Sequence, residues 1–507
     1  MQLTQGLRRN QSLNSKRTAT VCGDRRRTWG EVVDRVSRLA GGLQRRGARP
    51  GDRVGVLALN SDRYIEAYYA IAWAGAVAVP MNTRWARAEI DFAVADSQPR
   101  LMVVDQAFAE VGQALRAAGI ETVDMDPGEA GSFEDMIAEQ PPVPDALRGG
   151  DDLAGIFYTG GTTGRSKGVM LTHGGLASNF LMMIAVAPFP AEPVFLHTPP
   201  MFHLADAACI IGVTMLGGAH VVLPGFEPFA TLEAIEQHRI NSLVLVPTMI
   251  GMLCEALRTR PSDLTSVRRI AYGASPISEA VLKRAMAAFP NAEFGQAYGQ
   301  TELSPVATIL THADHLSGRL RSAGRAVPGM DLRIVDENLE TVPTGAVGEV
   351  AVRGPTVMKG YWGQPELTAQ TIVDGWLRTG DAGYLDEDGY LFLVDRVKDM
   401  IVSGGENVYS AEVENALMQH PAVLQCAVIG VPDDRWGERV HAVLYLRDGF
   451  SISDRDLADH CKPLIANYKR PRTFEVRDSP LPLSGAGKIL KTELRRPHWE
   501  GVDRKVG

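Results

Sequence analysis

One segment of the chain, residues 158–168, has the composition of a phosphate-binding loop. It reads YTGGTTGRSKG and combines flexible glycines and hydroxyl side chains with a lysine. Glycines let backbone N–H groups turn toward an anion, hydroxyls donate further hydrogen bonds, and Lys167 supplies positive charge. It is not a P-loop, because Ser166 precedes Lys167 and a strand-like stretch follows it. The segment predicts a loop between strands that holds a triphosphate, or else a glycine-rich hairpin without a ligand.

A second motif, AYGQTE at residues 297–302, has side chains suited to a nucleotide. An aromatic ring such as Tyr298 beside Gly299 can form a stacking surface for a purine. The hydroxyl of Thr301 and the carboxylate of Glu302 can meet a phosphate and its Mg²⁺. For this motif alone, a solvent-exposed turn is the other interpretation.

Three further motifs contain charged side chains that a ligand could use. Asp381 ends the run WLRTGD, and a carboxylate after a glycine turn can accept both hydroxyl protons of a ribose. The run DRVKD occupies residues 395–399, and the loop PLSGAGK at 482–488 carries Lys488 almost at the end of the chain. Taken singly, each has a plainer interpretation: a turn-capping aspartate, an exposed charge run and a solvated tail lysine.

Length and composition limit the kind of protein that carries these motifs. A chain of 507 residues is too long for one hydrophobic core, so we expect two or more domains. The net charge of −8 argues against a protein whose main task is to bind nucleic acid. The five cysteines are odd in number and scattered, which favours a reducing compartment. We find no signal peptide and no apolar run long enough to span a bilayer, and expect a cytoplasmic protein.

The elements that must position the motifs alternate between helix and strand in the first part of the chain. Thr28 and Glu31 have the spacing of a capping box before a helix, and residues 54–59 and 77–79 have the pattern of strands. This rhythm predicts a mostly parallel, doubly wound sheet, with ligands at the carboxyl ends of its strands. Residues 126–150 are rich in proline and glycine and predict a linker or surface excursion.

The pattern changes toward the C-terminus. From about Gly345, short strands and turns replace long helices and predict a small twisted β subdomain. After residues 395–399 the chain has the pattern of a separate α+β unit. The fold class expected is therefore α/β: a large N-terminal domain of doubly wound sheets with the β subdomain, residues 1–396, and a small mobile C-terminal domain, residues 397–507.

Taken together and in this order, the five motifs resemble those of the adenylate-forming superfamily. That family includes acyl-CoA synthetases, adenylation domains of non-ribosomal peptide synthetases and firefly luciferases. The resemblance runs from about residue 20 to residue 495. Two positions depart from the family's pattern: Gly160 stands where Ser is usual, and Ser166 where Pro is usual. Because one hydroxyl is lost and the loop gains a glycine, we expect altered kinetics with activity retained.

The resemblance implies a place for each part of ATP. The first loop would embrace the β- and γ-phosphates, Tyr298 would stack on adenine with residues 273–275 on its other side, and Asp381 would bind the ribose. The residues so assigned to ATP are Thr159, Gly160, Gly161, Thr162, Thr163, Gly164, Lys167, Gly273, Ala274, Ser275, Tyr298, Asp381 and Arg396.

The resemblance also implies the groups that act on the reacting atoms. Thr301 would contact the α-phosphate, Glu302 would hold Mg²⁺, and Lys488 would bridge the substrate carboxylate and the α-phosphate. Two anions must meet in this step, and an ammonium at about 4 Å contributes on the order of 4 kcal/mol at an effective dielectric near 20. That energy corresponds to roughly three decades in rate, so no covalent enzyme intermediate is required.

The expected reaction has two steps. A carboxylic acid and ATP first give an acyl-adenylate and pyrophosphate. The small domain then turns about the hinge at Lys398, withdraws Lys488 and brings the loop with Gly404, Gly405 and Glu406 to the site. Coenzyme A attacks the adenylate there and releases AMP.

The sequence PMFH at 200–203 bears on the choice of acid. Peptide-synthetase adenylation domains usually have an aspartate in place of His203, where it pairs with an amino group. We expect Phe202, His203 and Gly299 to border the acyl pocket. The stretch from Ala207 to Leu216 is apolar, and if it faces the ligand it favours a medium- or long-chain fatty acid. The same stretch is equally consistent with a segment of the hydrophobic core that contacts no ligand.

Three alternatives remain open at this point. The acid could be a hydroxycinnamate or benzoate type, the acceptor could be a carrier protein, or the chain could be a catalytically weak nucleotide-binding protein. The last is suggested only by Gly160 and Ser166. Four residues speak against it: Glu302, Asp381, Arg396 and Lys488. No carrier domain follows residue 507, which favours a stand-alone ligase, and a homodimer is left open.

Overall fold

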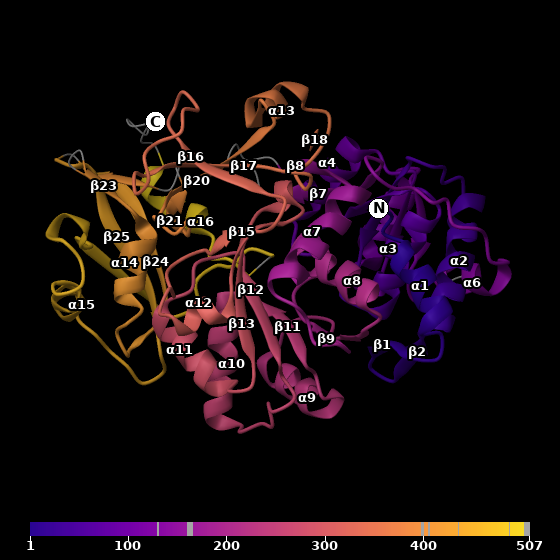
Figure 1. Ribbon diagram of the computed structural model, residues 1–507, viewed down its shortest axis with the longest axis horizontal. Coiled ribbons are helices and arrows are strands. Elements are labelled where there is room, and N and C mark those ends of the chain that lie inside the picture. Colours follow the sequence, from indigo (N-terminus) through magenta and orange to yellow (C-terminus); the bar gives the residue numbers. More distant parts are fainter. Residues whose placement is uncertain are drawn as a thin grey trace.

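The computed structural model describes residues 1–128, 131–159, 166–396, 400–403, 406–433, 435–485 and 487–500. Within these residues the strands form four sheets, and helices cover the faces of the two largest (Figure 1). The predicted α/β fold class is confirmed.

A seven-stranded sheet has the order β18-β8-β7-β4-β3-β5-β6. Its strands from β3 to β7 pair in parallel, whereas β8 pairs antiparallel with both β7 and β18. The strands are β3 (Arg53–Leu57), β4 (Val77–Pro80), β5 (Leu101–Val104), β6 (Glu121–Asp124), β7 (Leu153–Thr159), β8 (Lys167–Thr172) and β18 (Gly360–Tyr361), and the helices of this region are α2 (Trp29–Arg45), α3 (Asp62–Trp73), α4 (Arg87–Ser97), η1 (Gln106–Phe108), α5 (Ala109–Ala117) and α6 (Phe133–Glu139).

A nine-stranded sheet has the order β15-β14-β13-β12-β11-β9-β10-β1-β2, parallel from β13 to β1 and antiparallel at both edges. Its strands are β1 (Thr18–Cys22), β2 (Arg25–Thr28), β9 (Val194–His197), β10 (Ala219–Val222), β11 (Ser242–Leu245), β12 (Arg269–Gly273), β13 (Glu293–Gly299), β14 (Val306–Leu310) and β15 (Arg325–Ala326). The helices nearby in sequence are α1 (Gln5–Leu13), α7 (His173–Val186), α8 (Leu204–Leu216), α9 (Pro228–His238), α10 (Pro247–Thr259), α11 (Glu279–Ala288), η2 (Thr301–Leu303) and α12 (His312–Leu316).

The remaining two sheets are smaller. The first is antiparallel and contains β16 (Asp331–Val335), β17 (Gly348–Arg353), β19 (Ile372–Val373), β20 (Trp376–Leu385) and β21 (Leu391–Arg396), with α13 (Pro365–Thr371) beside it. The second contains β22 (Ile401–Ser403), β23 (Glu406–Val408), β24 (Val423–Asp433), β25 (Gly437–Leu446) and β26 (Thr473–Arg477), with α14 (Ser410–Leu417), α15 (Asp454–Cys461), η3 (Asn467–Lys469) and α16 (Lys491–Trp499). The chain thus changes sheets between β21 and β22, and a movable boundary at 396/397 stays a prediction.

Local sequence explains several of these elements. The capping box expected at α2 is present, since Thr28 N donates to Glu31 Oε2 at 2.7 Å and Glu31 N donates to Thr28 Oγ1. Such a cap typically contributes about 1 kcal/mol. Ser61 caps α3 with its hydroxyl, which accepts a hydrogen bond from Tyr64 N. Val54 and Val56 of β3 are fully buried, as a strand covered on both faces requires.

The proline-rich stretch predicted as a linker is instead partly helical. Ser132 and Asp135 form a capping box that starts α6, and this short signal was overlooked beside the prolines. The chain after α6 packs on the core, where Trp73 Nε1 donates to Val143 O at 2.9 Å. In the part of the chain that the structure describes, no helix has both the length and the apolar character needed to cross a membrane.

Candidate active site

Segments that follow the carboxyl ends of strands from both large sheets, one a loop and one the first turn of α10, border one site. Asn82 follows β4 of the seven-stranded sheet, and Thr248 follows β11 of the nine-stranded sheet. Both residues contact the loop that carries Lys488. This is the edge at which ligands bind in open parallel sheets.

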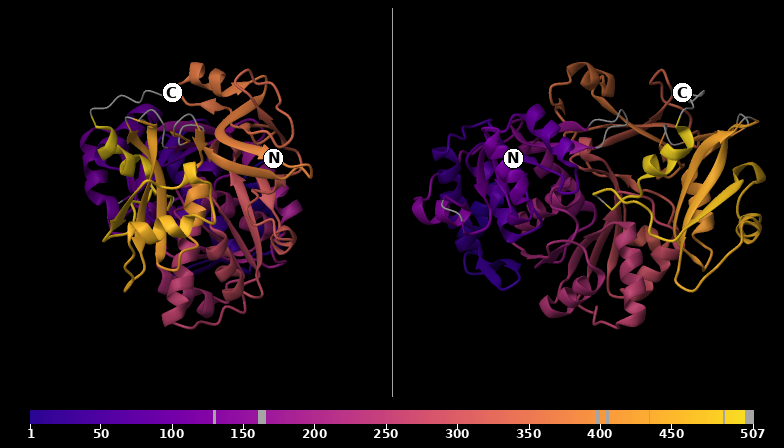
Figure 2. Two further views of the ribbon diagram at one scale, coloured as in Figure 1. Left: turned by 90° about the vertical axis from the view of Figure 1, so that its left-hand side faces the viewer. Right: turned by 180° about the vertical axis from the view of Figure 1, so that it is seen from behind.

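The loop with Lys488 reaches this edge from the C-terminal sheet (Figures 1 and 2, yellow). Arg84 donates from Nη1 to the carbonyl of Ser484 at 2.8 Å, and Thr248 donates from Oγ1 to the carbonyl of Gly487 at 3.0 Å. Inside the loop, Ser484 N donates to Lys488 O at 2.7 Å, and Lys488 N donates to Ser484 Oγ at 3.1 Å. Large-domain side chains therefore hold this turn on both sides of Gly485.

His203 lies directly under the docked turn. A Cβ placed on Gly485 would be 3.1 Å from His203 Nε2 and 2.9 Å from Asn82 Oδ1, so a larger residue here would require these side chains to shift. His203 Nε2 makes no hydrogen bond to any described residue. Burial first, and then the charges of Lys488 and Arg84, lower the pKa of His203 to about 3. The imidazole is therefore neutral at pH 7, and Lys488 is near enough to influence it.

The segment that presents His203 is rigidly held. Asn60 donates from Nδ2 to Pro199 O at 2.8 Å and accepts from Met201 N at the same distance. Tyr68 donates from its hydroxyl to Met201 O at 2.9 Å. The ring of Phe202 packs against that of His203, with centroids 4.4 Å apart.

Tyr298 and Asp381 meet although they belong to different sheets. The Tyr298 hydroxyl donates to Asp381 Oδ2 at 2.8 Å, and both residues are buried. Gly273 pairs with Ala297 and Ala274 has φ +68, so the backbone turns sharply at the end of β12. These positions agree with a common nucleotide edge, whereas their separate roles toward adenine and ribose stay predictions. Ser275 follows on the same turn, and Gly299 ends β13 where a Cβ would strike Pro305 O.

Glu302 is 8% exposed and is held by a tyrosine. Tyr361 of β18 donates from its hydroxyl to Glu302 Oε1 at 2.9 Å. The Nζ of Lys167 lies 5.2 Å from the centroid of the Tyr361 ring, in a cation–π geometry. Burial, followed by the Glu302 carboxylate, raises the pKa of Tyr361 above its usual value. Tyr361 thus connects the stem of the first loop to the proposed Mg²⁺ ligand, while Thr301 begins η2 beside it.

The first loop joins β7 to β8, as predicted, and Thr159 and Lys167 are register partners at its base. The predicted phosphate-binding residues Gly160, Gly161, Thr162, Thr163 and Gly164 lie outside the described residues, as do the hinge Lys398 and the glycines Gly404 and Gly405. Arg396 ends β21 opposite Asp381 in the sheet register. Glu406 is exposed at the start of β23.

Sequence reasoning missed four residues that build the site: Asn82, Arg84, Thr248 and Tyr361. The first three follow strands β4 and β11 at their carboxyl ends, and that position is a signal that could have drawn attention to them. Tyr361 carries no such signal, because it is brought to Glu302 by the pairing of β18 with β8.

The apolar stretch from Ala207 belongs to the core in this structure. Ala207, Ile210 and Ile211 line a cavity of about 40 Å³ between α8 and α3. Pockets for small ligands typically measure about 300–1,000 Å³. This cavity alone is too small to hold a long alkyl chain.

The low pKa of His203 leads to a prediction about stability. Between pH 6.5 and about 3 the unfolded chain binds a proton that folded His203 does not, so the free energy of unfolding falls as the pH falls. At pH 5 the loss from this residue should be about 2 kcal/mol. Urea unfolding at pH 7.5 and pH 5 should show a smaller pH dependence in His203→Gln than in the unmodified chain. An equal pH dependence of the free energy of unfolding in the two proteins would contradict the low pKa assigned to His203 in the folded state.

Comparisons with known proteins show which proteins this chain resembles. The model of the AMP-binding enzyme family matches residues 7–362, and that of the AMP-binding enzyme C-terminal domain matches residues 412–488. Feruloyl-CoA synthase from Amycolatopsis sp is 41% identical over 94% of this chain and 95% of that protein. Medium/long-chain-fatty-acid–CoA ligase FadD8 from Mycobacterium tuberculosis is 36% identical over 96% of this chain and 88% of that protein.

A solved structure shows the same overall arrangement. The anthranilate CoA ligase AuaEII in complex with anthranoyl-AMP has a TM-score of 0.93 and 28% sequence identity, with 98% of this chain and 97% of that chain covered.

Proposed function

Because the chain belongs to the adenylate-forming AMP-binding enzymes and is an AMP-forming acid–thiol ligase, we propose that it activates an aromatic acid of the hydroxycinnamate class. Its substrates are a small carboxylic acid, ATP and coenzyme A. The observation that carries the chemistry is the docking of the Lys488 turn against His203, at the edge where Tyr298 and Asp381 also meet.

The docked turn corresponds to the first half-reaction. Lys488 would face the point at which the acid approaches the α-phosphate, and its ammonium would reduce the repulsion between the two anions. His203 is neutral and borders this position, so it provides no fixed charge that would demand an amino group on the acid. Glu302 would hold Mg²⁺, because within the described residues Tyr361 bonds to only one of its two carboxylate oxygens.

Two observations support an aromatic acid over a fatty acid. The relative at 41% identity is named for feruloyl-CoA, and the structure with the TM-score of 0.93 contains anthranoyl-AMP. A medium-chain fatty acid is the second candidate, since the relative FadD8 is named for medium- and long-chain acids.

An acid panel tests the proposal. With ATP and Mg²⁺, pyrophosphate release should be at least tenfold more efficient in kcat/KM with ferulate or 4-coumarate than with decanoate or palmitate. Addition of coenzyme A should convert the adenylate to a thioester. A preference for decanoate would instead support a medium-chain fatty acid as the substrate. Activity only with an acyl-carrier protein would show that the acyl acceptor is that protein and not coenzyme A. If no acid leads to pyrophosphate release, the chain would better fit a catalytically weak nucleotide-binding protein.

In the second half-reaction, coenzyme A attacks the acyl-adenylate, and Lys488 would have to leave the active site first. We propose that the C-terminal unit turns about Lys398 and brings the loop with Gly404, Gly405 and Glu406 toward the site. Lys398→Pro should therefore slow thioester formation at least tenfold more than adenylation, because proline fixes φ and restricts the preceding residue. The two steps are measured separately, as pyrophosphate release without coenzyme A and as thioester formation from synthetic acyl-adenylate. Equal losses in both would place the hinge elsewhere.

Location and assembly stay proposals. The cysteines Cys22, Cys209, Cys254, Cys426 and Cys461 are all free, which agrees with the reducing environment of the cytoplasm. A homodimer is likewise kept as a proposal, with sedimentation of the purified chain as its test.

A further inference from the structure

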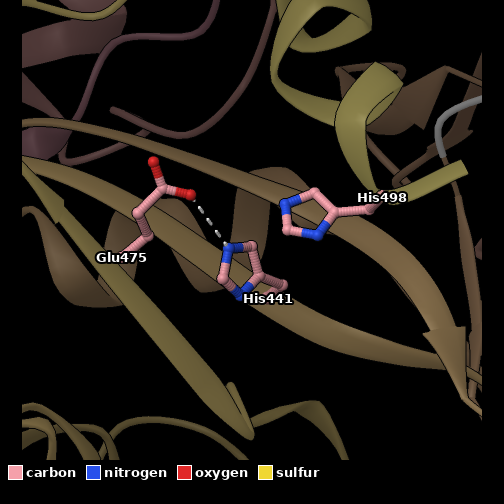
Figure 3. Close-up of side chains that lie close together, drawn as sticks. All are labelled: His441, Glu475 and His498. Carbon is pink, nitrogen blue, oxygen red and sulfur yellow. Dashed lines mark ion pairs between the residues drawn. The ribbon is translucent and has the colours of Figure 1, made fainter. Parts of the chain in front are cut away.

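Three potential metal ligands converge in the C-terminal sheet, away from the site described above. His441 lies on β25, Glu475 on the neighbouring β26 and His498 on α16 (Figure 3). One nitrogen or oxygen from each residue lies within 4.8 Å of the corresponding atoms of the other two. The imidazole rings of His441 and His498 have centroids 5.0 Å apart. Three elements that are separate in sequence therefore direct their donor atoms to one place.

His441 is held as a metal-binding histidine would be. It is 6% exposed, and its Nδ1 makes a hydrogen bond of 2.7 Å with Thr473 Oγ1. An Nδ1–H that donates to Thr473 leaves the lone pair of Nε2 for a metal, and it fixes the orientation of the ring. Nε2 makes no hydrogen bond within the described part of the chain, although it faces Glu475 Oε2 at 3.7 Å. A buried nitrogen left in this way costs free energy unless a ligand satisfies it.

We propose that His441, Glu475 and His498 bind a divalent transition-metal ion of the zinc type. Two imidazoles and a carboxylate are a common zinc donor set, and water can take the fourth position. Metal–ligand bonds of about 2.0–2.2 Å require the donors to be roughly 3.4 Å apart in a tetrahedron. The side chains need only close from separations of up to 4.8 Å to reach that geometry.

Neighbouring charges leave the required oxygen accessible. Arg477 donates from Nε to Glu475 Oε1 at 2.8 Å, whereas Oε2 is the oxygen that faces His441. Arg477 and the nearby Arg439 add positive charge that weakens cation binding, so we expect a micromolar rather than a picomolar site.

The position of the site suggests what the ion would do. β26 ends at Arg477 and α16 begins at Lys491, and the loop between them carries Lys488. An ion bound to Glu475 on one side and His498 on the other would join the two stems of this loop. Metal binding itself does not depend on the proposed ligase function, whereas this effect on the Lys488 loop rests on it.

The test uses the full chain after removal of metal with a chelator. Zn²⁺ is titrated in competition with a chromophoric indicator, and Co²⁺ is added separately to record the absorption bands of a tetrahedral site. We expect one ion per chain with micromolar affinity, and at least a tenfold weaker affinity in His498→Ala and in Glu475→Gln. Zn²⁺ should also raise the thermal unfolding midpoint of the unmodified chain.

His460→Ala is the matched control. His460 and His420 form a ring pair in the same unit with centroids also 5.0 Å apart, but they belong to no triad of potential ligands among the described residues. The control should bind Zn²⁺ like the unmodified chain. The proposal is overturned if the unmodified chain does not bind Zn²⁺, if both ligand variants keep its affinity, or if the control loses affinity equally. Circular dichroism of each variant verifies its folding, and His498→Gln replaces His498→Ala if the latter does not fold.

Discussion

Lys488→Ala should lower the rate of acyl-adenylate formation by about three orders of magnitude, because the ammonium contributes on the order of 4 kcal/mol to the approach of two anions. Backbone carbonyls of Ser484 and Gly487 accept hydrogen bonds from the large domain, and removal of the Lys488 side chain leaves both bonds in place. Pyrophosphate release without coenzyme A measures this step.

The same variant should still form thioester from synthetic acyl-adenylate, since Lys488 is expected to be withdrawn in that step. Lys283→Ala is the control, because Lys283 lies on the exposed face of α11 and forms a local ion pair with Glu279 of the same helix. Normal rates in both half-reactions of Lys488→Ala would refute the role of this lysine. Equal losses in both would indicate a role in folding or in binding of the adenylate.

Gly485→Val should lower adenylation by roughly 10–100-fold, from an overpacking cost of about 1–3 kcal/mol in the docked state. The first atom of the new side chain would already lie within 3.1 Å of Asn82 and His203. The φ of Gly485 is not in the left-handed region, so a side chain here causes no backbone strain. The substitution therefore tests the steric effect of the side chain alone. Pyrophosphate release and thioester formation are again measured separately, and only the first should suffer.

Gly225→Val provides the matched control, because a Cβ at Gly225 meets no atom within 4 Å. If Gly485→Val adenylates at the normal rate, the docked turn seen here is not the arrangement that performs the first step. If Lys488→Ala is impaired and Gly485→Val is not, the lysine acts from another position.

Much of the chemistry could be inferred from local sequence. The alternation of helices and strands, the capping box at Thr28 and the β7–β8 hairpin around Lys167 all depend on neighbours within a few residues. The five motifs also pointed to the adenylate-forming family, which the comparisons confirm. The α6 capping box at Ser132 was equally local and was overlooked.

The contacts that assemble the site could not be inferred in this way. Arg84 and Ser484 are 400 positions apart in the chain, and nothing near either residue specifies that one donates to the other. Tyr361 reaches Glu302 only because β18 pairs with β8. The apolar character of residues 207–211 was visible in sequence, but whether they faced a ligand or the core depended on how α8 packs.

The sequence alone therefore determined the class of chemistry and the order of the elements, because residue type and short-range spacing encode both. The tertiary structure decided where Lys488 docks, which side chains receive its turn, and that His441, Glu475 and His498 converge. Such encounters depend on the packing of many distant side chains at once, and no local pattern contains that information.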